Sequence, residues 1–330
     1  MVSRTLGDSD KVNTSLLACI ATLLITNSHL DHLYPDSRFG TGGSLGVALF
    51  FLLSGYGLAL SLTTGRGSLE TFIPYLIRRI ARIYPGLILV VITAISLKGQ
   101  WHELRLINWV SMFIWPTWYW FISAIVIFYI PFYWLGKLTA LQLLITIILL
   151  FIPYFYCYFS FLDLSYFSIE DGYFKWFIYF QLMLFGAWLA KSGVQRFNIN
   201  LAAVGFVGST LAFYLLKVLL FKFSLGSLQF LTHAILFPFV FFSFQFLTAS
   251  HAIASVKKWR LGWMVSFLGG LTLEIYLVQV PLIPFLSKQG WQFPVGLITA
   301  LLLIAIFSPI VSWFSKKIVY VINHFGVKVA

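Results

Sequence analysis

The chain has 330 residues, of which 60% are hydrophobic and only 10% are charged. Its mean hydropathy of +0.91 is far above what a water-soluble domain of this size sustains, so the composition predicts a membrane protein with no room for a large soluble domain. The net charge of +12 would suggest a nucleic-acid partner in a soluble protein. In a membrane protein it is first a topology signal, because Lys and Arg collect in cytoplasmic loops, and we expect no nucleic-acid partner.

Apolar stretches of about 20 residues, separated by polar or Gly/Pro breaks, recur along nearly the whole chain. They predict ten transmembrane helices, near residues 12–31, 43–62, 83–98, 118–136, 139–157, 173–190, 200–221, 228–249, 264–284 and 292–314. The segment 105–117 is too short to span a bilayer and rich in Trp, which is typical of an interfacial helix or of a misplaced helix start. The predicted fold is all-α, a single polytopic membrane helix bundle of about ten helices over residues 1–330.

The basic residues indicate how these helices are oriented. Fifteen of the 22 Lys and Arg residues fall on the side that holds the N-terminus, and five fall on the other side. This excess predicts that both termini are cytoplasmic and that the number of spans is even. The polar opening leads into a full-length apolar segment without a cleavage pattern, so we expect the first helix to stay in the membrane.

The chain offers little for metal or redox chemistry. Cys19 and Cys157 lie in apolar segments without CxxC spacing, and we interpret both as packing residues. His29 and His32 are three residues apart, but no further ligand is near, so no metal site is predicted. The remaining histidines are interpreted as loop or interface residues; they are His102, His233, His251 and His324.

The first predicted helix ends in Thr26-Asn27-Ser28-His29-Leu30-Asp31-His32, which places an imidazole within about one turn of the outer membrane surface. Ionisable groups at membrane depth usually face a bundle interior or a cavity, so His29 is a functional candidate. An imidazole suits a general base that takes a proton from a hydroxyl, and Asp31 and His32 could orient or charge it. The alternative is an interfacial residue hydrogen-bonded to water or headgroups.

Small residues at positions 42, 43, 46, 54, 55 and 57 allow neighbouring helices to approach closely. This pattern indicates packing. A phosphate-binding P-loop is excluded, because the pattern GxxxxGK[ST] is missing.

Three arginines stand close together before Tyr84 and Pro85 at the inner end of the third predicted helix. On a helix Arg78 and Arg82 are four residues apart and Arg79 and Arg82 three, so the guanidinium groups lie along one side. Planar five-donor groups arranged in this way suit a polyphosphate. The alternative is a positive-inside anchor that contacts anionic lipid headgroups.

Glu274 is an acid that we place well inside a predicted span, the ninth. Such a carboxylate must be paired, protonated or in a hydrated cavity, so we expect it to face the same interior as His29. A structural ion pair with an Arg of the third span is the alternative.

Trp115, Trp118 and Trp120 cluster at one predicted interface, where they either form part of an aromatic belt or stack on a sugar ring.

Four motifs follow one another along the chain: the His that closes the first helix, FFLLSGY at 50–56, RRIARIYP at 78–85 and LEIYLVQ at 273–279. In this order they resemble the acyltransferase-3 family, integral membrane O-acyltransferases of bacterial surface glycans. The resemblance covers almost the entire chain.

The resemblance implies a role for each motif. His29 would be the essential base or the acyl-carrying residue, with Asp31 beside it in the catalytic site, and the acceptor would be a sugar hydroxyl. The residues expected to hold the phosphates of an acyl-CoA entering from the cytoplasm are Arg78, Arg79, Arg82 and Tyr84. Those expected to bind the acceptor are Asn27, Ser54, Trp120, Glu274, Tyr276 and Gln279.

The chain departs from the family pattern at three positions. Many members carry an Arg at the position of Ala18, a Glu at that of Ile125 and a His at that of Gln279. These departures weaken any role that the resemblance would assign to the three positions. They do not affect the roles that it implies for His29 and the three arginines.

The resemblance also implies the surroundings of the protein. The donor substrate would be acyl-CoA, most readily acetyl-CoA, with no permanently bound cofactor, and the acceptor a glycan or a lipid-linked saccharide. The chain would be a multi-pass protein of the bacterial inner membrane that contacts membrane lipid and surface-polysaccharide assembly proteins. The alternative function is a transporter or flippase of a lipid-linked saccharide, which predicts two related halves and broken helices.

Overall fold

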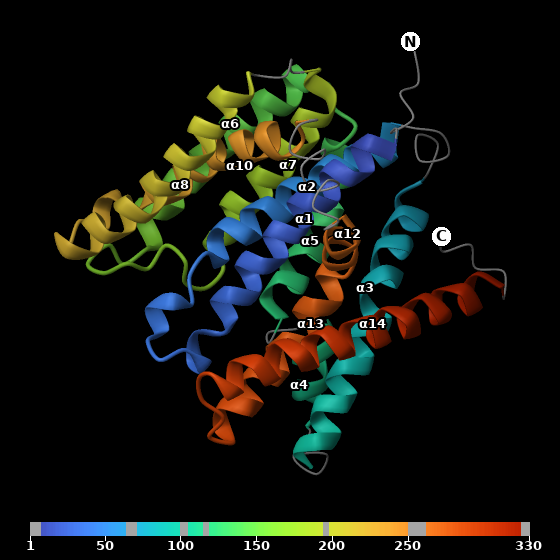
Figure 1. Cartoon of the computed structure of the whole chain (residues 1–330). Helices are drawn as coiled ribbons and strands as arrows, with labels where there is room; N and C mark the ends of the chain where they lie inside the picture. Colours follow the sequence, from blue (N-terminus) through green and yellow to red (C-terminus); the bar gives the residue numbers. More distant parts are fainter. Residues whose placement is uncertain are drawn as a thin grey trace. The chain divides into compact units, whose positions relative to one another are not determined.

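The computed structural model describes residues 8–63, 71–99, 105–114, 119–193, 198–249 and 262–324, and over these ranges all regular structure is helical (Figure 1). The prediction of an all-α membrane helix bundle is confirmed. The chain forms two compact units that alternate along the sequence. Unit 1 comprises Met1–Ala21, Ser44–Ser68 and Trp134–Gly270. Unit 2 comprises Thr22–Gly43, Leu69–Tyr133 and Leu271–Ala330.

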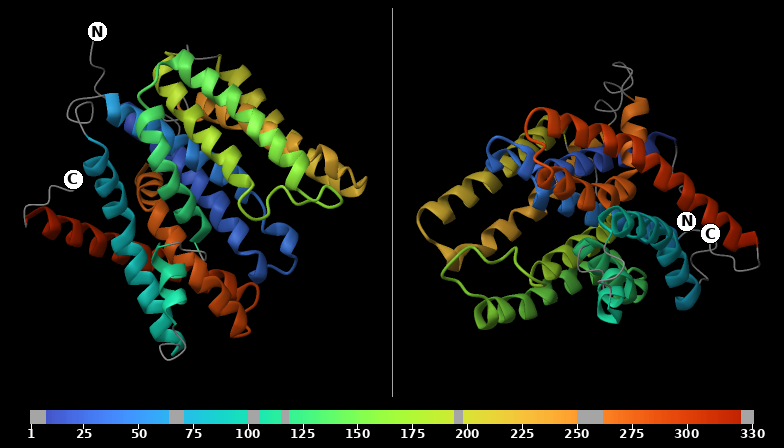
Figure 2. Two further views of the ribbon diagram at one scale, coloured as in Figure 1. Left: turned by 180° about the vertical axis from the view of Figure 1, so that it is seen from behind. Right: turned by 90° about the horizontal axis from the view of Figure 1, so that it is seen from below.

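Unit 1 holds the first part of α1 (Asp8–His29) and the larger number of helices. These are α2 (Gly43–Thr63), α6 (Ala140–Phe161), α7 (Lys175–Ser192), α8 (Ile199–Lys222), α9 (Phe230–Ala234), α10 (Leu236–Leu247) and α12 (Gly262–Gly270). Helix α6 packs along α7, and α8 packs along α10 (Figure 2).

Glycines bring α2 and α7 into backbone contact inside unit 1. A Cβ at Gly55 of α2 would overlap the carbonyl oxygen of Met183, and a Cβ at Gly186 of α7 would overlap that of Leu52. Only glycine allows such an approach, so the predicted packing role of the small residues is confirmed at Gly55. Gly57, two residues further along α2, has no atom within 4 Å of its would-be Cβ.

Unit 2 contains the end of α1 and the helices that follow the Arg run. They are α3 (Phe72–Lys98), α4 (Leu106–Trp109) with the π-helical turn η5 (Val110–Ile114), α5 (Trp120–Leu135), α13 (Thr272–Lys288) and α14 (Val295–His324). Helices α3, α13 and α14 pack side by side (Figures 1 and 2). At Gly86 of α3 a Cβ would stand 3.0 Å from Ser315 Oγ and 3.2 Å from Leu277 Cδ1, so this glycine allows a tight crossing.

Each of the ten predicted segments contains a helix, but the count of about ten spans is not confirmed. Within the residues that the structure describes, six helices are long and apolar enough to cross a membrane, or up to seven if the bent pair α12 and α13 is one span. That pair bends by 67° after Gly269 and Gly270, where the missing Cβ atoms weaken the helix. Two further apolar helices, Thr14–His29 and Trp120–Leu135, are shorter.

Two predicted boundaries differ most from the structure. Helix α3 begins at Phe72 rather than near residue 83, and α14 continues to His324 rather than ending near residue 314. Both extensions contain basic residues that interrupt the apolar pattern, and Arg and Lys are good helix formers. The interfacial segment predicted over 105–117 is helical at Leu106–Ile114, with the Trp109 side chain exposed.

Candidate active site

A polar seam runs between α1 and α13 within unit 2. Thr22, Thr26 and His29 are spaced by four and three residues and therefore share one face of α1. Thr22 Oγ1 donates a hydrogen bond of 3.0 Å to Thr272 Oγ1. Seven residues further along α1, or about two turns, the ring centroids of His29 and Tyr276 are 6.1 Å apart. The face of α1 that ends in His29 is thus turned toward α13.

The seam contains polar groups with unused hydrogen-bonding capacity. Thr272, Tyr276 and Gln279 repeat the four-and-three spacing on α13. In the described part of the chain, the buried Thr26 hydroxyl and both amide atoms of the fully buried Gln279 have no hydrogen-bond partner. Buried polar groups normally find partners, because an unpaired one costs about 1–3 kcal/mol. These two side chains are therefore available to hydrogen-bond a substrate or water.

Aromatic rings hold His29 from one side. The Tyr276 ring lies 6.0 Å from Tyr119 and 5.4 Å from Phe121, measured between centroids, so α5 and α13 jointly support it. The Tyr119 hydroxyl donates to the Leu277 carbonyl at 3.2 Å. His29 itself is half-buried. One face of the imidazole is thus fixed by packing, while the ring remains accessible.

In the described structure Asp31 hydrogen-bonds its neighbour His32 and not His29. Its carboxylate accepts from the His32 backbone N–H at 2.8 Å and lies 3.7 Å from His32 Nε2. A catalytic role for Asp31 stays a prediction.

Asn27 ties the loop after α1 to the helix. Its Nδ2 donates to the carbonyl oxygens of Phe39 and Thr41, both at 2.9 Å, and its Oδ1 accepts from the Tyr34 hydroxyl at 2.7 Å. Both amide N–H groups are occupied, so an acceptor could reach only the second lone pair of Oδ1. If Asn27 binds the substrate as predicted, the contact would be made by its Oδ1 atom.

The same loop carries an ion pair that does not titrate near neutral pH. The Arg38 guanidinium hydrogen-bonds Asp36 and holds the pKa of that carboxyl at about 2, below its ordinary 3.8. A depressed pKa means that the pair is fully formed above pH 3.8 and is lost only as the pH falls through about 2. Any pH dependence of activity near neutrality must come from another group.

The Arg run lies on α3 beside a buried tyrosine. Arg78 and Arg79 are half-buried and Arg82 is exposed. The Arg79 guanidinium stands 5.4 Å from the ring centroid of Tyr75. The Tyr75 side chain is fully buried, and its hydroxyl has no hydrogen-bond partner in the described residues.

Tyr75 is a candidate that sequence reasoning missed. It precedes Arg79 by four residues, so the helix places both side chains on one face, and this spacing was the signal. Tyr84, predicted to belong to the same group, is two residues from Arg82 and projects about 200° away around α3. The structure does not bring Tyr84 onto the face of the arginines.

Glu274 is not deep inside a continuous span, as predicted, but in the first turn of α13. The bend after Gly270 creates a helix N-terminus there, and free backbone N–H groups and the helix dipole favour a carboxylate at that position. Glu274 and Tyr276 are two positions apart, or about 200° around the helix. Glu274 therefore does not share the face of α13 on which Tyr276 lies, and the expectation that it faces the same interior as His29 stays a prediction.

Two other predicted acceptor residues lie on α2 and at the start of α5. Ser54 is half-buried on α2 of unit 1. Trp120 begins α5 and contacts Phe121 edge to face, with ring centroids 6.2 Å apart. Trp115 and Trp118 lie outside the described residues. Ile125, at the position where many members carry a Glu, is buried on α5.

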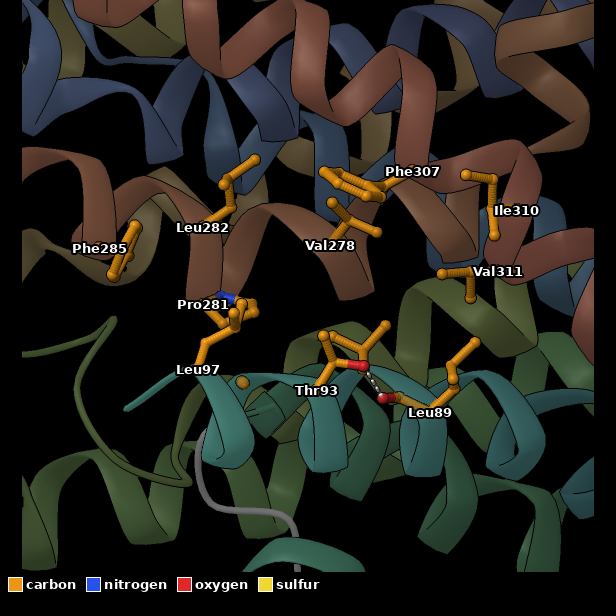
Figure 3. Close-up of a pocket in the computed structure, with 12 residues that line it drawn as sticks. Leu89, Thr93, Leu97, Val278, Pro281, Leu282, Phe285, Phe307, Ile310 and Val311 are labelled. Carbon is orange, nitrogen blue, oxygen red and sulfur yellow. Dashed lines mark hydrogen bonds between the residues drawn. The ribbon is translucent and has the colours of Figure 1, made fainter. Parts of the chain in front are cut away.

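An apolar cavity of about 300 Å³ lies between α3, α13 and α14 (Figure 3). Among its lining residues Thr93 carries the only hydroxyl group, and this group donates to the Leu89 carbonyl at 2.8 Å. The cavity thus fits hydrocarbon and not a sugar or a phosphate. Val278 lines it and is two residues from Tyr276, so the cavity and the seam lie on opposite faces of α13.

His233 corrects a prediction in unit 1. We interpreted it as a loop or interface residue, but it lies in α9 with 1% of its surface exposed. Its position within the apolar segment 228–249 was the missed signal, because an ionisable group there is costly. His102 and His251 lie outside the described residues, as does the side chain of His324.

A comparison with known protein families places these features together. The family model of the acyltransferase-3 family, described as an acyltransferase domain, matches residues 16–316. No curated protein matches the chain, and no solved structure does. The matched range is most of the chain and includes the α1–α13 seam and the Arg run, and the chain therefore belongs to the acyltransferase-3 family.

Proposed function

We propose that this membrane acyltransferase moves an acyl group, acetyl in the first instance, from cytoplasmic acyl-CoA to a hydroxyl of a cell-surface or exported glycan. The observation that carries the proposal is the position of His29. It ends a face of α1 that meets α13, with the unpartnered Thr26 hydroxyl and Gln279 amide on the two facing helices. A base beside spare hydrogen-bonding groups is what acyl transfer to a hydroxyl requires.

These residues supply the groups that each step of the proposed acyl transfer needs. His29 takes the proton of the acceptor hydroxyl while the hydroxyl oxygen attacks the thioester carbonyl. The C–S bond then breaks, the acyl group stays on the sugar oxygen, and the imidazolium returns the proton to the CoA thiolate. We assign Gln279 and Thr26 to hydrogen-bond the reacting oxygens. A covalent acyl-imidazole on His29 is the alternative route that the same geometry would serve.

The donor would bind at the other end of unit 2. Arg78, Arg79 and Arg82 supply the planar donors that phosphate groups prefer, and the buried Tyr75 hydroxyl adds a donor beside Arg79. From Arg82 to the end of α3 the helix rises about 24 Å. The pantetheine arm would cover part of that distance inside the membrane.

The surroundings follow from the same proposal. We place the protein in the bacterial inner membrane with both termini in the cytoplasm, as one domain. Acyl-CoA is a substrate there, without a resident cofactor, and the acceptor is a glycan or a lipid-linked saccharide. Membrane lipid and proteins of surface-polysaccharide assembly complete the set of proposed partners.

The direct test is label transfer. The purified protein in lipid nanodiscs is incubated with radiolabelled acetyl-CoA and candidate glycans, and the glycan is then separated and counted. Label on the glycan supports the acetyltransferase. Label that stays in acetyl-CoA with every glycan, while longer acyl-CoA donors also fail, contradicts the proposal.

One observation favours the transporter or flippase as a second candidate. The α12–α13 pair is bent by 67°, and broken spans are common at the binding sites of transporters. The break lies at Leu271, before the prolines of α13. Movement of a labelled lipid-linked saccharide across liposome membranes without acyl-CoA would support this candidate.

Replacing Arg78 and Arg82 together with Ala is expected to raise the KM for acyl-CoA at least tenfold and to change kcat little, because a hydrogen bond to a charged group contributes about 1.5–3 kcal/mol. Initial rates across a series of acyl-CoA concentrations measure this effect. Arg105→Ala, which removes an exposed arginine at the start of α4, is the matched control. A KM unchanged in the double variant would support the lipid-anchor interpretation.

A further inference from the structure

A second cluster of ionisable and hydroxyl side chains lies in unit 1, where α2, α7 and α9 meet the loop between α6 and α7. Its centre is the Glu170 carboxylate. Oε1 accepts from Ser44 Oγ at 2.9 Å and lies 3.8 Å from His233 Nε2, and Oε2 accepts from the Tyr179 hydroxyl at 3.5 Å. Lys175 Nζ donates to the Glu170 backbone carbonyl at 2.8 Å. The catalytic seam uses none of these groups.

His233 is incompletely paired. Its Nδ1 is 3.1 Å from the Tyr154 hydroxyl, whereas its buried Nε2 has no hydrogen-bond partner in the described residues. The 3.8 Å to Glu170 exceeds a hydrogen bond. One hydroxyl oxygen at about 2.8 Å from each of the two atoms would bridge them, as a water or a ligand does across such gaps.

The loop that presents Glu170 is held firmly in place. The backbone N–H groups of Ser168 and Ile169 both donate to Gln229 Oε1 at 2.8 Å, and Gln229 Nε2 donates to the Tyr166 carbonyl at 3.3 Å. Gln229 is fully buried. A binding residue on a loop fixed in this way loses little conformational entropy when a ligand arrives.

The cluster reaches the surface through Glu170, in a loop that also carries exposed aromatic residues. The Glu170 side chain is 25% exposed. Tyr173, three residues on, is 60% exposed, and its ring packs edge to face on Trp176 with centroids 5.0 Å apart. Tyr166, in the same loop, is 54% exposed. A carboxylate and an imidazole, with a supported aromatic ring three residues along the chain from the carboxylate, suit a polyol with one apolar face, such as a pyranose.

We infer that Glu170 and His233, with Tyr173, form a carbohydrate-binding subsite in unit 1 in which a sugar hydroxyl bridges Glu170 Oε1 and His233 Nε2. The inference deepens the proposed function, on which its choice of ligand rests: the subsite would take a pyranose unit of the acceptor glycan. The distribution of basic residues predicts that the loop carrying Glu170 lies on the outer side, where an exported glycan would be met.

Binding is tested without catalysis. The His29→Ala protein in nanodiscs, without acyl-CoA, is titrated with the methyl glycosides of galactose, N-acetylglucosamine, fucose and glucuronic acid, and binding is followed by saturation-transfer NMR. We expect at least one glycoside to bind. In the same background, Glu170→Gln, His233→Gln and Tyr173→Ala should each weaken its binding tenfold or more. Tyr158→Phe is the matched control, because it keeps the ring and removes a hydroxyl that donates to the backbone carbonyls of Gly226 and Ser227 and is not part of the proposed subsite.

Each outcome is decisive for the subsite. No binding by any of the four glycosides overturns the inference, and so does binding by Glu170→Gln and Tyr173→Ala that equals that of the parent. If His233→Gln does not fold, as its melting curve would show, the two more exposed positions decide. Binding without label transfer in the wild-type protein would leave the subsite standing and contradict the acyltransferase proposal instead.

Discussion

Replacing His29 with Ala is expected to lower the rate of acyl transfer by about 10²–10⁴-fold, the usual contribution of a positioned general acid or base. The protein should stay folded. The ring contact with Tyr276 is the main packing interaction lost, and an aromatic pair contributes only about 0.5–1.5 kcal/mol beyond its buried area. Label transfer and a thermal melt on the same nanodisc preparation measure both quantities.

His29→Gln is a second variant that separates proton transfer from hydrogen bonding. Glutamine can hydrogen-bond a hydroxyl from a similar position but cannot take up its proton near neutral pH. We expect it to be as inactive as His29→Ala. Activity retained by the Gln variant would mean that His29 positions the acceptor by hydrogen bonding, and the base would then have to be another residue.

Replacing Gly55 with Val is expected to cause the largest loss of stability, more than about 3 kcal/mol, which exceeds ordinary overpacking of a core. The first added carbon would overlap the Met183 carbonyl oxygen, which belongs to the backbone of α7 and cannot rotate away. The reciprocal contact of Gly186 with the Leu52 carbonyl leaves α2 no room to shift. The yield of folded protein and its melting temperature report the effect.

Gly57→Val is the matched control, on the same helix and two residues away. Its would-be Cβ meets no atom within 4 Å, and the position is exposed. We expect its melting temperature to stay near that of the parent. Equal behaviour of the two valine variants would show that the α2–α7 contact does not determine stability.

Some features could be predicted because they depend on local chemistry alone. The apolar stretches indicate where helices lie, since about 20 apolar residues have few other stable arrangements. The position of His29 at the end of α1 and that of the arginines along α3 could also be predicted, whereas their roles stay predictions. Gly55 was found because small residues mark close helix contacts.

The features that were missed depend on contacts between distant segments or on breaks in the helices. The unpaired state of Gln279 is visible only once α1 is seen beside α13. Glu274 was misplaced because hydropathy does not show a bend, and the bend gives its carboxylate a helix terminus. The importance of His233 could have been predicted, because an ionisable side chain within an apolar segment is as costly there as it is at His29.

The crossing at Gly86 links the two ends of unit 2. This residue lies four positions after Arg82 on α3, and a Cβ there would stand 3.2 Å from the side chain of Leu277. The carbonyl of Leu277 in turn accepts from Tyr119, which supports the Tyr276 ring beside His29. If the phosphates of acyl-CoA bind to the Arg run as proposed, these contacts would carry a shift of α3 to the residues around the imidazole. By thermodynamic linkage, donor and acceptor would then change each other's affinity by the same factor, whichever of the two binds first.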